Sequence, residues 1–483
     1  MVDIDTPQHA YQSQRRRQWD SVCLDTESRG RRTGLFYHTL LERYYRIIIP
    51  SGLTILELGC GRGDLLDALR PRYGVGIDFS YQMIAGAKKS HPHLHFICAD
   101  VHQPPLLGQF DIIILSDLIN DLWDVQAVFS AMTLFSHAGT RVVINFFNNM
   151  WRIPLGLARR TRLAADMLEQ NWLTPEDVTN LLQLSGFEPI VHQTKILLPI
   201  PWPVLEPLAN RFLVNFPPFH WFGLTNYIIA RPQASPGKSP HHGSVPLVSV
   251  IVPARNEAGN ISDLVQQTDI PGYRIELIFV EGGSTDETGD VIRRTAAEFP
   301  EKNCRLIRQP GQGKGDAVRA GLDAAGGDIL IILDADMTVP PEYLPRFIEA
   351  LVSGKGDLIN GVRLVYPLED KSMRFLNMVI NKVFSLLFSW LLGQPVKDTL
   401  CGTKTLWKRD YERMQQSPDY PSLMDPFGDF DLLFKAARIN LRIVDLPVRY
   451  RRRRYGTTKI KRWRHGWILM KMVFLTARRI KFR

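Results

Sequence analysis

The 483-residue sequence contains few cysteines, and their spacing excludes several classes of protein. The five are Cys23, Cys60, Cys98, Cys304 and Cys401, and no two of them form a C-x-x-C pair. Such scattered thiols argue against a disulfide framework, and they indicate a reducing, cytoplasmic compartment.

Long apolar runs are also missing. No uninterrupted run reaches the roughly 20 residues that a membrane-spanning helix needs. Residues 1–5 lack the basic and then apolar pattern of a secretory signal peptide. The sequence also has no fixed-period repeat. We therefore expect a globular protein that does not cross a bilayer.

Acidic residues are absent from the C-terminal tail. Residues 451–483 contain 13 Lys and Arg and no Asp or Glu. The whole chain has 59 basic and 49 acidic residues, which leaves 46 basic and 49 acidic residues outside the tail. Because the positive charge is local, it indicates an anionic partner at the tail, such as a membrane surface, and no nucleic acid.

A Pro-, Gly- and Ser-rich segment, residues 232–246, has the composition of a linker. We predict an N-terminal extension over 1–34, a first domain over 35–231 and a second domain over 247–483. In both domains short apolar runs alternate with helical patterns, so each domain is predicted to have an α/β fold. The expected strands are 54–58, 73–77, 95–98, 111–115 and 141–147, then 248–252, 275–280, 305–308, 329–333 and 358–362.

The first predicted strand ends in a glycine-rich turn that follows Glu57 and contains Gly59 and Gly61. Glycines at a strand-to-helix turn allow the backbone to approach a ligand closely. Asp78 ends the second predicted strand, where a carboxylate could bind ribose hydroxyls. Asp100 ends the third, where it could accept a hydrogen bond from an adenine amino group.

This series of motifs resembles the class I S-adenosylmethionine-dependent methyltransferases, which have a Rossmann-like fold. The resemblance implies that Glu57, Gly59 and Gly61 line the methionine end of S-adenosylmethionine, with Asp78 at the ribose and Asp100 at the adenine.

The methyl acceptor cannot be read from these residues. Asp117, after the fourth predicted strand, is a candidate base, although methyl transfer can rely on positioning alone. A non-catalytic binding module is the alternative for this domain.

In the second half, the predicted strand 329–333 runs into Asp334-Ala335-Asp336. A nucleotide diphosphate becomes a good leaving group only when its charge is neutralised, and Mg²⁺ or Mn²⁺ prefer carboxylate oxygens. Asp334 and Asp336 are therefore the predicted metal ligands. Lys314 adds a positive charge near phosphate, but Gly315 follows it, so the glycine-rich segment is no Walker A loop.

Two further polar segments follow strands, Pro253–Glu257 and Glu281–Asp286. The four motifs together resemble glycosyltransferase family 2, an inverting GT-A fold, over nearly all of 247–483. A departure is Glu281-Gly282, where the family usually has two aspartates. The resemblance implies binding of the nucleotide-sugar by Pro253, Ala254, Glu257, Glu281, Asp286, Lys314, Asp334 and the phosphate-binding Arg363.

The acceptor motifs leave two mechanisms open. Residues 398–404 and 453–459 resemble the dolichyl- and polyprenyl-phosphate sugar synthases. A lipid phosphate is already ionised, its second pKa being about 6, so it needs cations such as Arg453. A glycan hydroxyl instead needs a general base, for which Asp429 and Asp431 are the candidates.

A predicted helix over Phe375–Leu392 bears one polar stripe of Asn377, Asn381, Ser385 and Ser389, and its remaining surface is almost entirely apolar. It suits either the membrane interface or burial against the domain. With the basic tail, it leads us to expect a cytoplasmic protein attached peripherally to the cytosolic face of an anionic membrane.

The sequence thus predicts a bifunctional enzyme. One activity is metal-dependent, inverting transfer of a sugar from a UDP- or GDP-sugar to a polyprenyl or dolichyl phosphate, and the other is S-adenosylmethionine-dependent methyl transfer. The alternative is a transferase that acts on a glycan hydroxyl and carries a non-catalytic N-terminal module.

Overall fold

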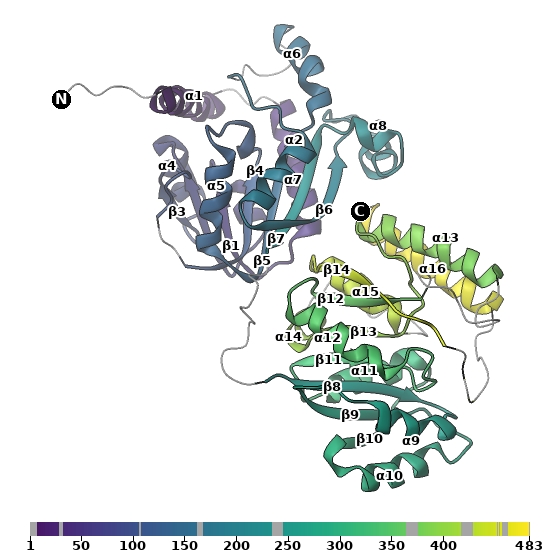
Figure 1. The fold of residues 1–483 in the computed structure, drawn as a ribbon. Coiled ribbons are helices and arrows are strands. Elements are labelled where there is room, and N and C mark those ends of the chain that lie inside the picture. Colours follow the sequence, from purple (N-terminus) through teal and green to yellow (C-terminus); the bar gives the residue numbers. More distant parts are fainter. Residues whose placement is uncertain are drawn as a thin grey trace. The chain divides into compact units, whose positions relative to one another are not determined.

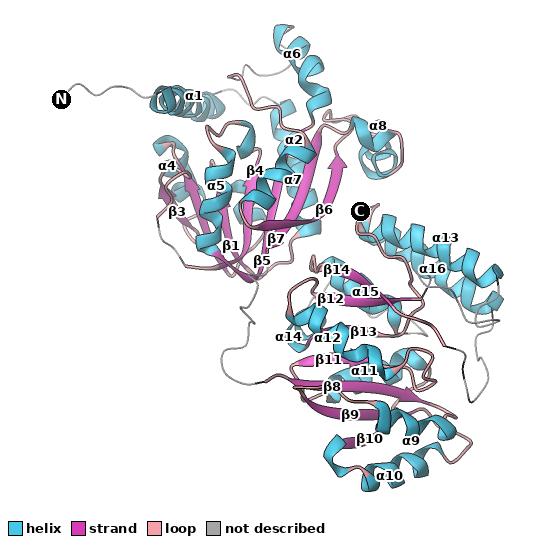
Figure 2. Ribbon diagram, viewed as in Figure 1, coloured by secondary structure: helices cyan, strands magenta, loops and turns pink. Residues whose placement is uncertain are grey.

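A computed structural model describes residues 7–28, 32–105, 108–161, 168–233, 245–363, 375–416, 428–451, 453, 455 and 462–482. The chain divides into two compact units, Met1–Gln233 with Arg479–Arg483, and Ala234–Arg478. Each unit contains a sheet flanked by helices (Figures 1 and 2), so the predicted α/β class is confirmed for both. Most of the predicted linker lies outside the described residues.

The first unit has seven described strands in the order β3-β2-β1-β4-β5-β7-β6. The strands β1 to β5 pair in parallel, and β7 runs antiparallel to both β5 and β6. The five predicted strands are confirmed, whereas β6 and β7 were not predicted. The strands are β1 (Thr54–Leu58), β2 (Tyr73–Asp78), β3 (His95–Cys98), β4 (Phe110–Ser116), β5 (Ser136–Phe147), β6 (Phe187–Lys195) and β7 (Thr225–Pro232).

Helices alternate with the strands of this sheet along the chain, as they do in parallel α/β domains. The sequence Thr174-Pro175 begins α7 as a capping box, in which the Thr174 hydroxyl accepts from the Asp177 backbone N–H. The helices are α1 (Pro7–Ser28), α2 (Arg32–Ile48), α3 (Asp64–Ala68), α4 (Tyr81–Ser90), α5 (Val125–Ala131), α6 (Arg152–Arg160), α7 (Pro175–Leu184) and α8 (Leu205–Pro207).

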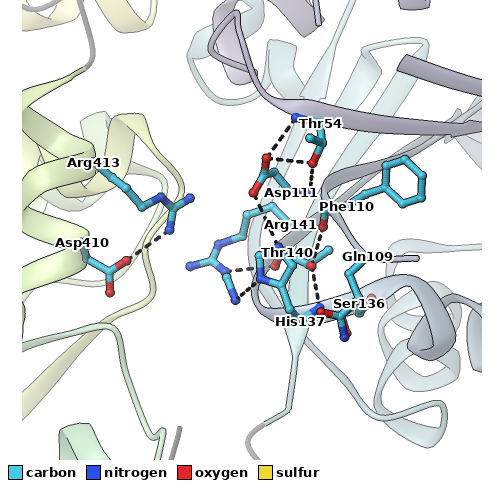
Figure 3. Close-up of polar contacts among 11 residues, drawn as sticks. Thr54, Gln109, Phe110, Asp111, Ser136, His137, Thr140, Arg141, Asp410 and Arg413 are labelled. Atoms are coloured by element: carbon cyan, nitrogen blue, oxygen red, sulfur yellow. Dashed lines mark hydrogen bonds and ion pairs between the residues drawn. The ribbon is translucent and has the colours of Figure 1, made fainter. Parts of the chain in front are cut away.

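Polar contacts fix the amino-terminal edge of this sheet (Figure 3). The Asp111 carboxylate on β4 accepts from the backbone N–H (2.9 Å) and the hydroxyl (2.8 Å) of Thr54 on β1. On β5, the Thr140 hydroxyl donates to the carbonyl of Phe110 at 2.7 Å. These contacts set the register at one edge, so that the carboxyl ends of β1, β2, β4 and β5 meet at the opposite edge.

The second unit has seven described strands in the order β10-β9-β8-β11-β13-β12-β14. Only β13 is antiparallel to its neighbours, β11 and β12. The five predicted strands are again observed, and β13 and β14 are additional. The strands are β8 (Leu247–Ala254), β9 (Arg274–Glu281), β10 (Cys304–Arg308), β11 (Ile329–Ile332), β12 (Leu358–Val362), β13 (Lys404–Trp407) and β14 (Ile443–Pro447).

A core of aliphatic side chains from β8, β9 and β11 and from the covering helices supports this sheet. An ion pair between Asp410 and Arg413 joins the first and last turns of α14 (3.1 Å, Figure 3). The helices are α9 (Ala258–Gln267), α10 (Thr288–Glu298), α11 (Lys314–Ala324), α12 (Leu344–Val352), α13 (Phe375–Leu392), α14 (Lys408–Gln415), α15 (Asp429–Arg438) and α16 (Arg462–Ile480).

The helix α13 has its polar side turned inward. Asn381 and Ser385 are buried, and their side chains donate to the Asp398 carboxylate (2.9 Å) and the Val396 carbonyl (2.6 Å). Phe388 is also buried, whereas Val383 and Leu386 are 52% and 62% exposed. One apolar side of α13 therefore packs against the domain, as one of the two predicted arrangements requires, and another side faces outward, while its contact with a membrane stays a prediction. Among the helices that the structure describes, none is both long and apolar enough to span a membrane.

Candidate active sites

The two predicted metal ligands follow β11 directly. Lys314, at the start of α11, lies 2.6 Å from one carboxylate oxygen of Asp334. Burial opposes ionisation of Asp334, but Lys314, assisted by Lys404 and Arg363, holds the pKa of this carboxyl below its usual value. Asp336 accepts from the backbone N–H (3.1 Å) and the hydroxyl (2.8 Å) of Thr338 and pairs with Arg453. Each carboxylate thus has a basic side chain in contact with it.

The segment 398–404 lies directly against Asp334. A Cβ added at Gly402 would be 2.3 Å from a carboxylate oxygen of Asp334 and 2.4 Å from the Lys314 amine. A glycine is therefore required for the loop to approach this closely. Next to it, the Lys404 amine is buried and donates to the Cys401 carbonyl at 2.5 Å.

A buried ion pair anchors this loop. The guanidinium of Arg363 donates to the two carboxylate oxygens of Asp398 at 2.7 and 2.9 Å, and Asn381 donates to the same group. Burial raises the pKa of Asp398, but Arg363 outweighs that effect and the pKa is about 2. The structure thus engages Arg363 with Asp398, a contact that competes with its predicted binding of phosphate.

The donor set fits a hard divalent cation. In the described part of the chain no three Asp, Glu, His or Cys side chains form a metal cluster. Asp334 and Asp336 would be the protein ligands of such a cation, and water and diphosphate oxygens would complete the shell, as is usual for Mg²⁺. A cation held there would neutralise charge on the diphosphate leaving group.

The predicted nucleoside contacts lie at the carboxyl ends of β8 and β9, where Ala254 is paired with Glu281. Glu281 accepts from the backbone N–H of Ser284 at 2.5 Å. Burial opposes the ionisation of Glu281, but hydrogen bonds from Ser284 and Gly283 hold its pKa below the usual value. The Glu281 carboxylate thus stabilises its own loop.

Neighbouring predicted contacts also have structural partners. Glu257 is buried and accepts from the Asn260 amide at 2.8 Å. Asp286 accepts from the backbone N–H groups of Thr288 (3.0 Å) and Ala258 (3.4 Å), so it fixes the start of two helices. Pro253 is half-buried one residue before the end of β8.

The segment that follows β14 crosses the same edge of the sheet. The backbone N–H of Arg451 donates to the Thr338 carbonyl at 2.8 Å, and Arg453 reaches Asp336. A Cβ at Gly259 would lie 2.6 Å from the Tyr455 ring, so Tyr455 packs on the start of α9. The basic segment therefore contacts the loop that contains Asp336. Gly456–Lys459 lie outside the described residues.

The candidate bases belong to α15. Asp431 is buried, and its carboxylate lies 3.1 Å from the Lys435 amine. Asp429 begins the helix, but its side chain lies outside what the structure describes. A Cβ at Gly428 would lie 2.8 Å from the Gly315 Cα, so α15 and α11 begin in contact. Asp431 is thereby on an element that adjoins Lys314.

In the first unit, the glycine-rich turn surrounds a buried acid. Gly59 and Gly61 have positive φ angles of 71° and 52°, and Gly61 N–H donates to Asp78 at 2.9 Å. Glu57 is buried, which raises its pKa well above the usual value, and the Asp64 and Asp78 carboxylates add to the effect. Among the described residues, one Glu57 oxygen has no hydrogen-bond partner. A buried acceptor beside an open glycine turn fits the amino group of S-adenosylmethionine.

The predicted N-terminal extension lies on this site. The Gln12 amide on α1 donates to one oxygen of Asp100 at 2.8 Å, and the His102 backbone N–H donates to the other at 2.9 Å. The hydroxyl of Ser80, next to the Asp78 loop, donates to Asp20 on α1 at 2.5 Å. The helix α1 thus covers the predicted adenosine-binding edge, a contact that no local sequence pattern indicates.

Asp117 sits at the carboxyl end of β4 in a left-handed conformation, with a φ of 53°. The Tyr37 hydroxyl (3.2 Å) and the Asn145 amide (2.6 Å) donate to its carboxylate. Burial raises the pKa of Asp117 to about 7, against the lowering effect of these hydrogen bonds. A carboxyl that titrates near neutral pH can accept or donate a proton. Sequence reasoning missed Tyr37 and Asn145 because only the fold brings them to Asp117.

Comparisons with known proteins match a different family model to each of the two units. Residues 249–439 match the model of "Glycosyl transferase family 2", and residues 55–139 match that of a "Methyltransferase domain". The chain is 28% identical over 246 residues to a dolichol-phosphate mannosyltransferase of Pyrococcus furiosus. It is 25% identical over 224 residues to an undecaprenyl-phosphate 4-deoxy-4-formamido-L-arabinose transferase of Edwardsiella ictaluri. It is 30% identical over 227 residues to a dolichyl-phosphate hexose transferase of Haloferax volcanii.

These matches cover 49%, 45% and 47% of this chain and 67%, 63% and 92% of the three relatives. The chain thus spans about two thirds of the length of the first two. The fold and the matched models define an enzyme with a glycosyltransferase domain and a methyltransferase domain. The chain belongs to glycosyl transferase family 2.

The closeness of Gly402 to Asp334 predicts a strong effect of a single methyl group. Gly402→Ala places its Cβ within 2.4 Å of both Asp334 and Lys314, so the loop must move away. We expect kcat/KM for sugar transfer to fall at least about 100-fold, since misplacement of about 1 Å costs that much. The control is Gly289→Ala in α10, where the nearest atom is at 3.9 Å. Equal activity of the two variants would contradict this interpretation.

The raised pKa of Asp117 predicts a pH-dependent stability. The folded state binds the Asp117 proton more tightly than the unfolded state does. The protonated carboxyl therefore contributes to the free energy of unfolding at low pH, and this contribution is lost as the pH rises from 3.8 through about 7. Asp117→Asn should therefore gain Tm relative to the wild type over this range, by at least about 3 °C above pH 7.

Asp111→Asn is a control for which the Tm difference from the wild type should depend on pH in the opposite direction. His137 and Thr54 hold the pKa of Asp111 below its usual value, so its contribution is lost as the pH falls. Thermal unfolding across the pH range measures both variants. A Tm difference for Asp117→Asn that does not change with pH would show that Asp117 titrates normally.

Proposed function

We propose that the second unit transfers a sugar from a UDP- or GDP-sugar to a polyprenyl or dolichyl phosphate, with inversion and with Mg²⁺ or Mn²⁺. The observation that carries this proposal is the approach of the loop 398–404 and of the basic segment after β14 to the aspartate pair, with Gly402 against Asp334 and Arg453 on Asp336. The named functions of the matched relatives support the same acceptor class.

Each residue has a role in this proposal. Asp334 and Asp336 hold the metal ion, which supplies charge neutralisation of the diphosphate. Lys314 and Arg453, which in this structure pair with Asp334 and Asp336, are available to phosphate once a divalent cation takes over these carboxylates. Pro253, Ala254, Glu257, Glu281 and Asp286 form the nucleoside edge, the last three through the loops they stabilise.

The environment of Asp431 favours an ionised acceptor. Its carboxylate is buried and paired with Lys435, whereas a general base must reach the acceptor hydroxyl. A phosphate needs no base but needs cations, and Arg453, Lys314 and Lys404 are at this edge. The second candidate, a glycan hydroxyl acceptor with Asp429 or Asp431 as the base, is an outcome of the test below.

For the first unit we propose methyl transfer from S-adenosylmethionine, over the domain boundaries predicted from the sequence. Glu57, Gly59, Gly61, Asp78 and Asp100 would hold the cofactor. Its sulfonium supplies the methyl group, and Asp117 would accept the proton of the methyl acceptor.

We also propose that the protein is cytoplasmic and binds the cytosolic face of an anionic membrane through its second unit. On α16, Trp467, Met470 and Phe474 are 76%, 47% and 68% exposed and recur at helical spacing on one side. Val383 and Leu386 of α13 are also exposed. Apolar and aromatic side chains in a basic segment are typical of helices that lie in a membrane interface.

Identification of the product tests the acceptor. Purified protein is incubated with a panel of UDP- and GDP-sugars, Mn²⁺ and polyprenyl phosphate, and the lipid fraction is analysed by mass spectrometry. We expect a polyprenyl-phosphate sugar, its loss in Asp334→Asn or without Mn²⁺, and turnover of Asp431→Asn within about tenfold of wild type. Lys435→Gln is the matched control for loss of the buried pair.

If instead Asp431→Asn loses activity about 100-fold or more while Lys435→Gln does not, Asp431 is a base and the hydroxyl acceptor is favoured.

Co-sedimentation with vesicles tests the membrane surface. Wild-type protein should pellet with phosphatidylglycerol-containing vesicles at low salt, and Trp467→Ser with Phe474→Ser should reduce binding at least about tenfold. Leu134→Ser, at a 56% exposed site on the first unit, is the control. The proposal fails if wild-type protein stays in the supernatant, or if the double variant binds as well as the control.

A further inference from the structure

The connection between β6 and β7 exposes an unusual amount of apolar surface. Ten large hydrophobic side chains between residues 200 and 222 are each at least 42% exposed. Two of them, Phe212 and Phe216, stack on Phe482 of the same chain, at 5.3 and 5.9 Å between ring centroids. Soluble surfaces seldom expose so many large apolar side chains unless they bind a partner. The residues are Ile200, Trp202, Val204, Leu205, Leu208, Phe212, Phe216, Phe219, Trp221 and Phe222.

A second apolar segment adjoins the first. Met150, Ile153 and Leu157, at the start and on one side of α6, are 55%, 74% and 58% exposed. The Trp151 indole N–H donates to the Phe222 carbonyl at 2.8 Å, so the two segments are in contact. We call residues 148–161 and 196–224 together the apolar face.

The register of the sheet places this face at the functional edge. Phe147, the last residue of β5, is paired with Thr225, which is paired with Lys195, the last residue of β6. Both segments of the apolar face therefore leave the sheet at the carboxyl end of β5. Asp117 follows β4 at this same edge, and Asn145 on β5 donates to it.

The charge of the apolar face is of one sign. Its sequence contains Arg152, Arg159, Arg160 and Arg211 and a single acid, Glu206. Glu206 is buried, whereas Arg152 and Arg160 are exposed, and Arg211 donates to the Phe482 carbonyl. Aromatic rings among arginines suit the interface of an anionic bilayer, where rings enter the headgroup boundary and cations meet phosphates. Two copies of this face would instead bring arginines together, which disfavours self-association.

We infer that the apolar face of the first unit binds an anionic lipid bilayer, so that the edge proposed for methyl transfer opens toward lipid. This inference goes beyond the proposed function, whose membrane contacts lie on α13 and α16 of the other unit. It rests on the proposed methyl transfer only for the use of that edge.

An environment-sensitive fluorophore shows directly which surface enters the bilayer. Full-length protein carries the label at Trp202→Cys or Trp221→Cys, with Cys23, Cys98 and Cys304 replaced by Ser. Leu184→Cys is the matched control, because Leu184 is 70% exposed at the end of α7, and the next strand, β6, begins at the opposite edge of the sheet. We expect a blue shift and reduced quenching by iodide at positions 202 and 221 on phosphatidylglycerol vesicles, and neither at 184.

Partitioning gives the second measurement. Trp202→Ser, Trp221→Ser and Phe222→Ser together should weaken binding to these vesicles at least about tenfold, equivalent to about 1.4 kcal/mol. Leu184→Ser should leave binding unchanged. Thermal unfolding of the triple variant checks that it folds, and the labelled single variants decide the question if it does not.

Three results would overturn the inference. The labels at 202 and 221 could stay unshifted on vesicles that bind the chain, which would assign binding to α13 and α16 alone. They could be shifted before vesicles are added, which would show that protein covers this face. A concentration-dependent dimer in light scattering, lost in the triple variant, would make the face a contact between copies. None of these readouts depends on methyl or sugar transfer, so they separate this inference from the proposed activities.

Discussion

The arrangement of the second unit depends on one buried ion pair, Arg363–Asp398. The Asp398 carboxylate accepts from Arg363 on one side and from Asn381 of α13 on the other, while its carbonyl accepts from the Asn360 amide of β12. This single group therefore holds a strand end, a helix and the loop that carries Gly402. A buried charge is tolerated only when it is fully paired, and removing one partner typically costs about 3–5 kcal/mol. The position of the loop against Asp334 follows from that requirement.

The strands that were predicted and those that were missed differ in a physical way. Central parallel strands such as β11 are buried on both faces and read as continuous apolar runs, so local sequence identifies them. The missed strands contain polar residues whose burial depends on distant partners. The buried Lys404 begins β13, and Asp445 within β14 accepts from Asn360. Nothing near these residues in the sequence reveals those partners, so their pairing could not be predicted.

The same distinction applies to the candidate sites. Asp334 and Asp336 could be located because both acids immediately follow a strand that the sequence identifies. The contacts between Gln12 and Asp100 and between Tyr37 and Asp117 join residues 88 and 80 positions apart, so only the tertiary fold brings them together. The roles predicted for Arg363 and Asp286 treated them as groups available to a ligand, whereas the structure gives both carboxylate or backbone partners. Sequence patterns thus locate a functional edge of a sheet, but they do not indicate which side chains at that edge already have hydrogen-bond partners within the protein.

The inward polar side of α13 has a mechanical consequence. Asn381 connects this helix to Asp398, and three residues beyond Asp398 the loop reaches Cys401 and then Gly402 beside Asp334. Val383 and Leu386 lie on the outer side of the same helix. A displacement of α13 would therefore act on the loop that contacts Asp334 through the Asn381–Asp398 hydrogen bond. If the outer side of α13 rests on a bilayer, adsorption would act as an effector of the aspartate pair, and its effect could be measured with a short-chain, water-soluble acceptor.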